Sequence, residues 1–422
     1  MEIRPFQGWR YAATGGDVSA FLAPPYDVLS AADKDLLLAA EPRNVVAVDL
    51  PHSPPAADAP DEAYRRAAEA LDAWRSEGLL RRDPRPALYA YEQSYAWAGR
   101  RHVRRAVVAA VRLRPLGEGI HPHEKTFSGP KADRLKLRRF TGMQMSPVLG
   151  FHDGPTDAAE ALFAAAGEAP DAVATLGGVR ERLWAVSDPA AVARAADALA
   201  GADLFIADGH HRYTTALTYR DGLGDLPADH PANFVMFVLV AADDPGLTVL
   251  PTHRVIAGMR DVDAGGFRRL TRGVLDHRAV EITPDDAADA GAFLARFGRG
   301  AMGFALGGET IVSRLTDPTA MDRVAAERVP AWRALDVAVL HRLVLDHCLA
   351  DLKTNRMLID YVADGRAALA AARAGRADLV CLLQPTPLDA VQRIARAGEV
   401  MPHKSTYFYP KAATGMVLYP LT

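Results

Sequence analysis

Residues 206–216 carry the sequence Ile-Ala-Asp-Gly-His-His-Arg-Tyr-Thr-Thr-Ala, and the rest of the chain is organised around this stretch. The apolar run at 203–207 predicts a short buried strand, which ends at the turn signal Asp208-Gly209. Three side chains that can bind anions follow at once: His210, His211 and Arg212. A helical pattern starts at Thr214, so free backbone N–H groups and the positive end of the helix dipole would point the same way as Arg212. The stretch therefore predicts a phosphate-binding site.

Two other interpretations of this stretch stay open. Asp-Gly is a common turn, and paired histidines often lie on surfaces or satisfy buried carbonyls, so a purely structural turn also fits. A metal site is the second alternative because histidine is a common ligand. Neighbouring residues point in different directions in regular structure, however, so one ion rarely takes both His210 and His211.

A second polar block lies at residues 119–126, Gly-Ile-His-Pro-His-Glu-Lys-Thr, and glycine and proline predict a loop there, followed by a helix from about Lys131. Glu124 is the candidate general base, since a carboxylate can take a proton from a hydroxyl that attacks phosphorus. Lys125, Thr126 and Lys131 are candidate phosphate-binding residues. A structural ion pair or a metal ligand are the alternative roles for Glu124.

Two further segments supply candidate residues. At residues 23–28, Ala-Pro-Pro-Tyr-Asp-Val, the prolines fix an extended backbone that can hold Tyr26 and Asp27 rigidly, although Asp27 can equally cap the next helix. At residues 401–411, Met-Pro-His-Lys-Ser-Thr-Tyr-Phe-Tyr-Pro-Lys, a cation and two hydroxyls stand together. These residues are Lys404, Ser405 and Thr406. Their side chains suit a phosphate or carboxylate ligand. The alternative is a basic loop anchored by aromatic residues.

The composition excludes several classes of protein. The chain has 422 residues, of which 49% are hydrophobic and 24% charged, as in ordinary globular proteins. Its net charge of −3 gives no global basic field for nucleic acid. Two cysteines predict no disulfide framework and favour a reducing cytoplasm. No run of about 18 apolar residues occurs, so we expect no membrane span.

Periodicity predicts both helices and strands along the whole chain. We expect a helix capped by Ser30, a strand at 44–50, a helix at 61–77, and a hairpin from strands at 87–95 and 102–113. Beyond the central stretch, we expect a buried strand at 233–240 and a hairpin within 301–315. The predicted fold class is α/β (α+β) with mixed sheets. The expected segments are 1–100 (α/β), 101–258 (core), 259–330 (α+β) and 331–422 (α/β).

Two resemblances rest on these motifs. The five residues from Asp208 to Arg212 are similar to the DGHHR box of the ParB/sulfiredoxin-like fold, in particular of its free-serine kinases. The chain as a whole resembles domain-of-unknown-function family 1015 at residues 23–28, 123–126, 207–213 and 401–411. The first resemblance implies a ParB/sulfiredoxin-like core at residues 101–258 and nucleotide-phosphate binding at the box. The second is specific for the family and implies no reaction.

Together these observations predict a kinase that moves phosphate from ATP or ADP to a hydroxyl of a serine-like or hydroxy-acid metabolite. Glu124 would be the base, with Asp27 as its rival, and Asp208 could orient phosphates or Mg²⁺. Tyr26, Lys404, Ser405 and Thr406 would hold the substrate. The expected partners are a nucleotide and a small molecule rather than a membrane or nucleic acid, and a homodimer is left open.

Two other functions stay open at this stage. One is a nucleotide-binding regulatory or DNA-linked protein that resembles ParB, which the charge and the lack of an evident helix-turn-helix disfavour. The other is a metal-dependent hydrolase that uses four histidines: His121, His123, His210 and His211.

Overall fold

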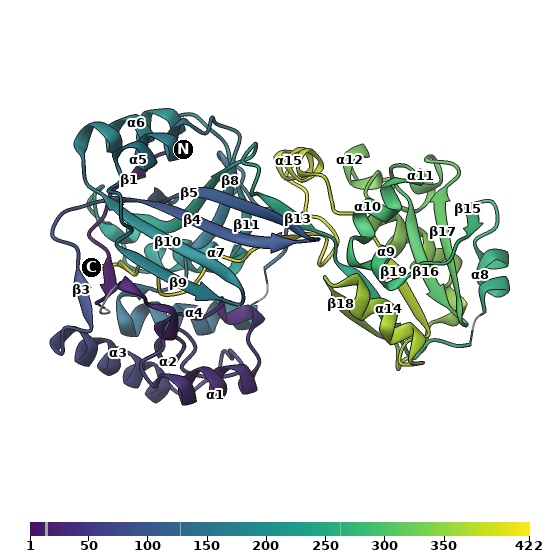
Figure 1. Cartoon of the computed structure of the whole chain (residues 1–422), viewed down its shortest axis with the longest axis horizontal. Coiled ribbons are helices and arrows are strands. Elements are labelled where there is room, and N and C mark those ends of the chain that lie inside the picture. Colours follow the sequence, from purple (N-terminus) through teal and green to yellow (C-terminus); the bar gives the residue numbers. More distant parts are fainter. Residues whose placement is uncertain (13–15, 127, 262) are drawn as a thin grey trace. The chain divides into compact units, whose positions relative to one another are not determined.

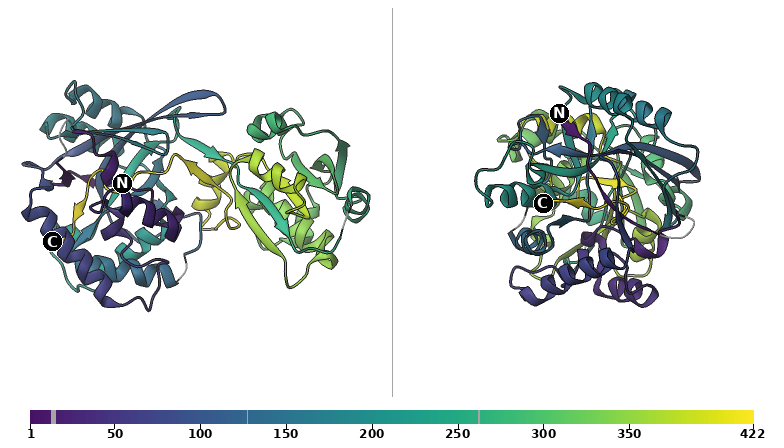
Figure 2. Two further views of the ribbon diagram at one scale, coloured as in Figure 1. Left: turned by 60° about the horizontal axis from the view of Figure 1, so that its bottom comes forward. Right: turned by 90° about the vertical axis from the view of Figure 1, so that its left-hand side faces the viewer.

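The protein has two compact units (Figure 1), of which the computed structural model describes residues 1–12, 16–126, 128–261 and 263–422. Unit 1 comprises Met1–Thr248 and Pro410–Thr422, and unit 2 comprises Val249–Tyr409. The last residues of the chain thus return to unit 1, where Figure 2 shows both termini. Both units combine helices with sheets, so the predicted mixed α/β fold class is confirmed.

Unit 1 is built on a nine-stranded sheet in the order β6-β11-β8-β12-β5-β4-β10-β9, with β1 beside β5. Parallel and antiparallel pairs alternate near one edge, because β11 pairs parallel with β6 and antiparallel with β8. The strands of this unit are β1 (Ile3–Arg4), β2 (Trp9–Tyr11), β3 (Leu80–Arg82), β4 (Leu88–Trp97), β5 (Arg100–Arg112), β6 (Ile120–His121), β7 (Met143–Gln144), β8 (Val148–His152), β9 (Ala172–Leu176), β10 (Val179–Val186), β11 (Leu204–Asp208), β12 (Phe234–Ala241) and β21 (Tyr419–Pro420).

The long hairpin of β4 and β5 is the centre of this sheet, and it forms as the sequence predicts. Its turn uses Ala98 and Gly99, which both have a positive φ, as a two-residue hairpin turn requires. The expected segment boundary between residues 100 and 101 falls inside this hairpin. The first two predicted segments therefore share one sheet, because backbone hydrogen bonds pair β4 with β5 from Tyr89 to Trp97.

The helices of unit 1 lie on the two sides of the sheet. Figure 1 shows α5 and α6 on one side and α1 to α4 on the other. Buried residues of α5 and α6 share one apolar core with β4, β5, β11 and β12. The helical elements are η2 (Ser19–Phe21), η3 (Tyr26–Val28), α1 (Ala31–Ala40), α2 (Val46–Asp49), α3 (Asp61–Ser76), α4 (Ser128–Thr141), α5 (Asp157–Ala165), α6 (Pro189–Leu199), α7 (His210–Asp221) and η4 (Pro231–Asn233).

The strand predicted at residues 44–50 is wrong, because this segment forms the short helix α2. The Asn44 side chain accepts a hydrogen bond from the Val46 N–H at 2.9 Å and donates to the Leu22 carbonyl at 2.7 Å. This local bonding starts a helical turn and buries Val45, Val46 and Val48. A short apolar run fits a buried helix as well as a strand, so its pattern does not decide between them.

A carboxyl is buried between two central strands of unit 1. Glu181 in β10 accepts hydrogen bonds from the Tyr91 hydroxyl at 2.6 Å and from Gln93 Nε2 at 3.0 Å. Burial raises the pKa of Glu181 to about 7, although these two bonds and the charge of Arg104 favour the carboxylate. The side chain therefore changes its charge near neutral pH.

Glu181→Gln should stabilise the protein more at about pH 8 than at about pH 5. The pKa of Glu181 rises from its ordinary value of 4.5 to about 7 in the fold. The stabilisation that protonated Glu181 provides is therefore complete below the ordinary pKa of 4.5. It is lost as the pH rises through the folded-state pKa of about 7. Glutamine does not titrate, so the difference in free energy of unfolding between the two proteins should change by about 3 kcal/mol over this range. Chemical denaturation of both proteins at both pH values measures this change, and a difference independent of pH would contradict it.

Unit 2 has a six-stranded antiparallel sheet in the order β15-β17-β16-β19-β14-β18. Residues of α9, α10 and α14 pack with this sheet in one apolar core. The strands are β13 (Thr248–Leu250), β14 (His253–Ala257), β15 (Leu275–Ala279), β16 (Met302–Leu306), β17 (Glu309–Leu315), β18 (Leu358–Val362), β19 (Leu379–Leu382) and β20 (Tyr407–Tyr409). The helices are α8 (Ala264–Leu270), α9 (Pro284–Ala288), α10 (Ala290–Ala295), α11 (Ala320–Val324), α12 (Pro330–Arg333), α13 (Asp336–Ala338), η5 (Val339–Cys348), η6 (Ala350–Leu352), α14 (Gly365–Arg373) and α15 (Leu388–Arg396).

Both hairpin strands predicted within 301–315 are present as β16 and β17. Among the described residues, none of the helices has both the length and the apolar character that crossing a membrane requires.

Candidate functional site

The turn between β11 and α7 needs a glycine for two reasons. Gly209 has a φ of +93°, which side chains rarely adopt, and a Cβ at this position would lie 2.8 Å from Arg212 Nε. Because this residue turns the chain at once, α7 begins at His210 rather than at the expected Thr214. His210, His211 and Arg212 thus form the first turn of the helix, where the dipole favours an anion.

Asp208 is the acidic centre of this turn. Its Oδ2 accepts a hydrogen bond from the Arg212 guanidinium, and its Oδ1 lies 2.5 Å from Lys411 Nζ. Burial opposes ionisation, but the charges of Lys411 and Arg212 outweigh it and hold the pKa of Asp208 well below its usual range. One carboxylate and two cations leave one positive charge at the start of α7.

Asp208 is a poor fit for the expected Mg²⁺ ligand. Both of its oxygens already bind cationic side chains, and a metal ion would have to displace one of them. Within the part of the chain that the structure describes, no group of three or more histidine, cysteine or acidic side chains could hold a metal ion.

Arg212 is committed to protein partners. Besides Asp208, its guanidinium donates to the Pro147 carbonyl, and only 4% of the residue is exposed. These hydrogen bonds hold the turn before α7 against the loop that precedes β8. The predicted contact of Arg212 with a phosphate stays a prediction.

His210 is a neutral histidine that faces Glu124. The His123 backbone N–H donates to His210 Nε2 at 3.2 Å, so this nitrogen carries no proton and Nδ1 carries one. Nδ1 lies 3.9 Å from Glu124 Oε2. Burial, reinforced by His123, lowers the pKa of His210 well below its usual value. The ring therefore directs a neutral N–H toward Glu124, at a distance too long for a hydrogen bond. The predicted contact of His210 with a phosphate stays a prediction.

His211 joins the residues that the sequence singled out in different segments. Its side chain is half-buried, and this burial lowers its pKa. The charges of Asp27 and Glu124 oppose that shift and those of Lys131 and Arg212 reinforce it, so all four lie within electrostatic range of the ring. Asp27, in η3, is exposed, whereas about a third of the Glu124 side chain is exposed. The fold thus brings together candidate residues from three separate segments of unit 1.

Of the four histidines proposed for a metal site, His123 and His210 lie ring against ring, with centroids 4.7 Å apart. His121 Nε2 lies 3.5 Å from Asp203 Oδ1, and its ring stacks on Phe205. His123 is buried with a hydrogen bond to the backbone of Ile206, and burial lowers its pKa to about 4. These contacts give both rings structural positions beside β11.

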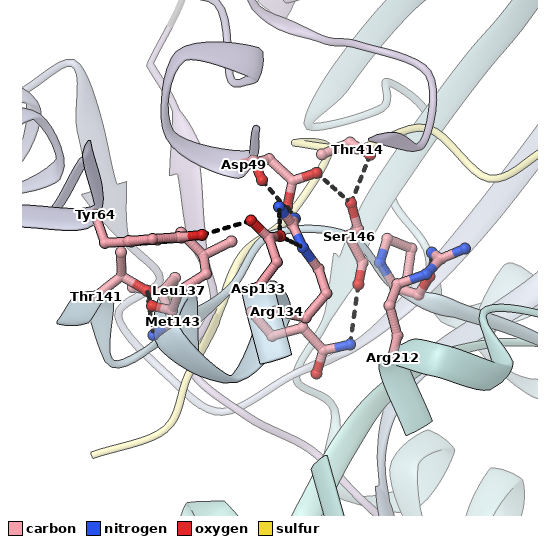
Figure 3. Close-up of polar contacts among 12 residues, drawn as sticks. Asp49, Tyr64, Asp133, Arg134, Leu137, Thr141, Met143, Ser146, Arg212 and Thr414 are labelled. Carbon is pink, nitrogen blue, oxygen red and sulfur yellow. Dashed lines mark hydrogen bonds and ion pairs between the residues drawn. The ribbon is translucent and has the colours of Figure 1, made fainter. Parts of the chain in front are cut away.

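A buried network of charges lies beside Arg212 (Figure 3). Arg134 in α4 pairs with Asp133 at 2.6 Å and donates to the Asp49 carbonyl, and Ser146 donates to Asp49 Oδ2 at 2.9 Å. The Arg134 guanidinium also lies 4.2 Å from the centre of the Tyr26 ring. Burial raises the pKa of Tyr26, which keeps its hydroxyl protonated at the edge of the site.

Three residues of the site and its support were not predicted from the sequence: Asp49, Arg134 and Lys411. Lys411 is the last residue of the stretch 401–411 that carries the family resemblance. That resemblance is the one feature of the sequence that points to Lys411. Asp49 lies in the segment predicted as a strand, and Arg134 lies in the helix predicted from about Lys131, with no role assigned to it. Lys125, which is exposed, and Thr126, which is half-buried, follow Glu124 directly as expected.

The expected substrate-binding residues Lys404, Ser405 and Thr406 belong to unit 2. Ser405 Oγ donates to the Pro402 carbonyl at 2.5 Å, and the Thr386 hydroxyl donates to the Ser405 carbonyl at 2.8 Å. Their predicted contact with a substrate stays a prediction.

Comparisons with known proteins identify a family and several distant structures. A family model described as "Protein of unknown function (DUF1015)" matches residues 3–338. A search of curated proteins finds no match. Similar solved structures include a free serine kinase variant in complex with AMP, at 13% identity and a TM-score of 0.36, covering 74% of this chain and 92% of that one. A complex of such a variant with ADP has 13% identity and a TM-score of 0.33, covering 75% and 93%. SbnI from Staphylococcus aureus, with a C-terminal truncation, has 12% identity and a TM-score of 0.35, covering 74% and 87%. Likeness at this level assigns no residue and no reaction.

Proposed function

The chain belongs to the DUF1015 family, and we propose that it is a small-molecule kinase. It would transfer phosphate from ATP or ADP to a hydroxyl of a serine-like or hydroxy-acid metabolite. Membership of the family assigns no reaction, so the proposal rests on unit 1. The observation that carries it is the Glu124 carboxylate facing the Nδ1–H of His210, in the first turn of α7.

This pair suits proton transfer beside a bound phosphate. The substrate hydroxyl oxygen would form a bond to the terminal phosphorus of the nucleotide, and its proton would pass to Glu124. The bond between that phosphorus and the bridging oxygen would break, and its electron pair would leave with the shortened nucleotide. His210, kept neutral by burial, would orient Glu124 through its N–H without neutralising the carboxylate that must accept the proton.

The phosphates would lie at the N-terminus of α7. The helix dipole and the net positive charge of Asp208, Arg212 and Lys411 both favour an anion there. His211 and Lys131 would add side-chain contacts, since the charge of Lys131 acts on the His211 ring and neither residue is fully buried. Lys125 and Thr126 are proposed to contact the same phosphates.

Tyr26 is proposed to contact the substrate. Tyr26 has a protonated hydroxyl near Arg134 and Asp27. Asp27 is the rival general base, because its charge also acts on His211.

The function is tested by a phosphoryl-acceptor screen with the full chain. ATP, ADP and CTP are each incubated with serine and with short hydroxy acids, in buffer that contains Mg²⁺, and the shortened nucleotide and the phosphorylated product are quantified. We expect product from one of the two adenine nucleotides, in equal amounts with the shortened nucleotide. Zinc-dependent hydrolysis without an acceptor, or CTP binding that requires DNA, would refute the kinase in favour of one of the two other functions.

Lys131→Gln should weaken nucleotide binding by about tenfold, because it removes one charge-assisted contact to a phosphate. Isothermal titration calorimetry with ADP measures the change. Arg139→Gln is the matched control, since Arg139 is exposed on the same helix and loses the same charge. Equal effects of the two variants would show that only the overall charge of α4 matters, and would contradict a direct contact.

A further inference from the structure

Unit 2 contains a small cavity, open at one edge, that the proposed kinase does not use. Its volume is about 50 Å³, and its polar lining includes Thr252, Arg254, Arg299, Asp336, Thr386 and Ser405. A water molecule needs roughly 10–15 Å³ on this measure, so the cavity has room for a few waters or for one small oxyanion.

Arg254 is a buried cation with neutral partners. Only 1% of the residue is exposed, and its guanidinium donates to His341 Nε2 at 3.0 Å and to the carbonyls of Thr252, His403 and Lys404. Within the described residues no carboxylate lies at ion-pair distance from it. Burial lowers the pKa of Arg254 to about 10, which leaves it charged at neutral pH. A buried charge without a counter-charge is unfavourable, so the cavity beside it is short of one negative charge.

Thr252 provides a second, independent sign of a missing ligand. Its residue is 5% exposed, and its Oγ1 has no hydrogen-bond partner in the part of the chain that the structure describes. Buried hydroxyls are normally hydrogen-bonded, and an unpaired one calls for a specific explanation. Thr252 and Arg254 line the same cavity, so one anion could accept hydrogen bonds from both.

The loop at the wall of the cavity is held in an unusual conformation. Lys404 has a φ of +53°, which is uncommon for a residue other than glycine. Arg254 holds the carbonyls of His403 and Lys404, and Thr386 holds that of Ser405. Strained backbone of this kind persists only where the surroundings fix it, as they do at binding sites.

We propose that this cavity binds a small oxyanion, either a phosphate or a short carboxylate, through the Arg254 guanidinium and the Thr252 hydroxyl. Arg299, which is exposed, would add attraction at the edge of the cavity. Asp336 is the carboxyl of the lining and opposes an anion when it is ionised. The site lies wholly within unit 2 and does not depend on the proposed kinase activity.

The experiment is calorimetric titration of the full chain with inorganic phosphate, sulfate and acetate, each at matched ionic strength. Thr252→Val keeps the shape of the side chain but removes its hydroxyl, so it should weaken binding by about tenfold and also raise the thermal midpoint of unfolding. Arg299→Gln should weaken binding about threefold, and Asp336→Asn should strengthen it about threefold. A preference for phosphate and sulfate over acetate would identify a tetrahedral anion, and the reverse a carboxylate.

Two controls separate this site from other anion binding. Arg296→Gln removes an exposed charge three positions before Arg299 and outside the lining, and should leave the affinity unchanged. Lys131→Gln, which tests the proposed kinase site in unit 1, should also leave it unchanged. The proposal is overturned if none of the three anions binds at millimolar concentrations, or if Thr252→Val raises the thermal midpoint without changing the affinity. Loss of anion binding in Lys131→Gln would overturn it too, because the anion would then bind in unit 1.

Discussion

Glu124→Gln should lower kcat for phosphoryl transfer by about 10²–10⁴-fold while nucleotide affinity stays within about twofold. Glutamine has nearly the same shape but cannot accept the proton of the attacking hydroxyl. The amide oxygen can still face the Nδ1–H of His210, which lies 3.9 Å from the carboxylate in the natural protein. Steady-state kinetics with the acceptor found in the screen, together with calorimetric titration of ADP, measures both quantities.

Glu118→Gln is the matched control for this experiment. Glu118 is exposed in the loop before β6 and loses the same charge, so its kinetics should not change. Normal turnover of Glu124→Gln would place the base elsewhere, and Asp27→Asn would then be the variant expected to lose activity. Loss of nucleotide affinity along with turnover would mean that Glu124 organises the binding site rather than accepts the proton.

Arg212→Ala should lower the free energy of unfolding by about 3–5 kcal/mol, because it removes one partner of a buried ion pair. Asp208 would keep Lys411 alone, and the Pro147 carbonyl would lose its donor. The phosphate-binding role predicted for Arg212 from the sequence would make this variant weaken nucleotide binding. The structure predicts a loss of stability as well, because the Arg212 guanidinium bonds Asp208 and the Pro147 carbonyl. Chemical denaturation followed by tryptophan fluorescence measures it, because four of the five tryptophans lie in unit 1.

Two substitutions test the reason for this loss. Arg212→Lys keeps the positive charge beside Asp208 and should lose clearly less stability than the alanine variant. Arg220→Ala removes a partly exposed arginine from the other end of α7 and should cost less than about 1 kcal/mol. A cost for Arg212→Ala as small as that of Arg220→Ala would contradict a structural role for the Arg212 pair.

The sequence by itself determined the local elements of this protein and the family to which it belongs. The β4–β5 hairpin, α3 and the strand β11 all follow from periodicity and turn residues, because these patterns record which face of an element is buried. The start of α7 was placed four residues late, since only the positive φ of Gly209 lets the helix begin at His210. The segment at 44–50 was assigned wrongly, because the bonds of Asn44 to another segment select a helix there.

The tertiary structure alone decided how the candidate residues act on one another. Asp208 binds Lys411, 203 positions away, and His210 accepts from the backbone of His123, 87 positions away. No local pattern encodes such pairs, because they depend on how separate elements pack. The sequence could name His210 and Arg212 as side chains that can bind a phosphate. Burial keeps His210 neutral and favours the pairing of Arg212 with Asp208, because an unpaired charge is unfavourable in a buried position.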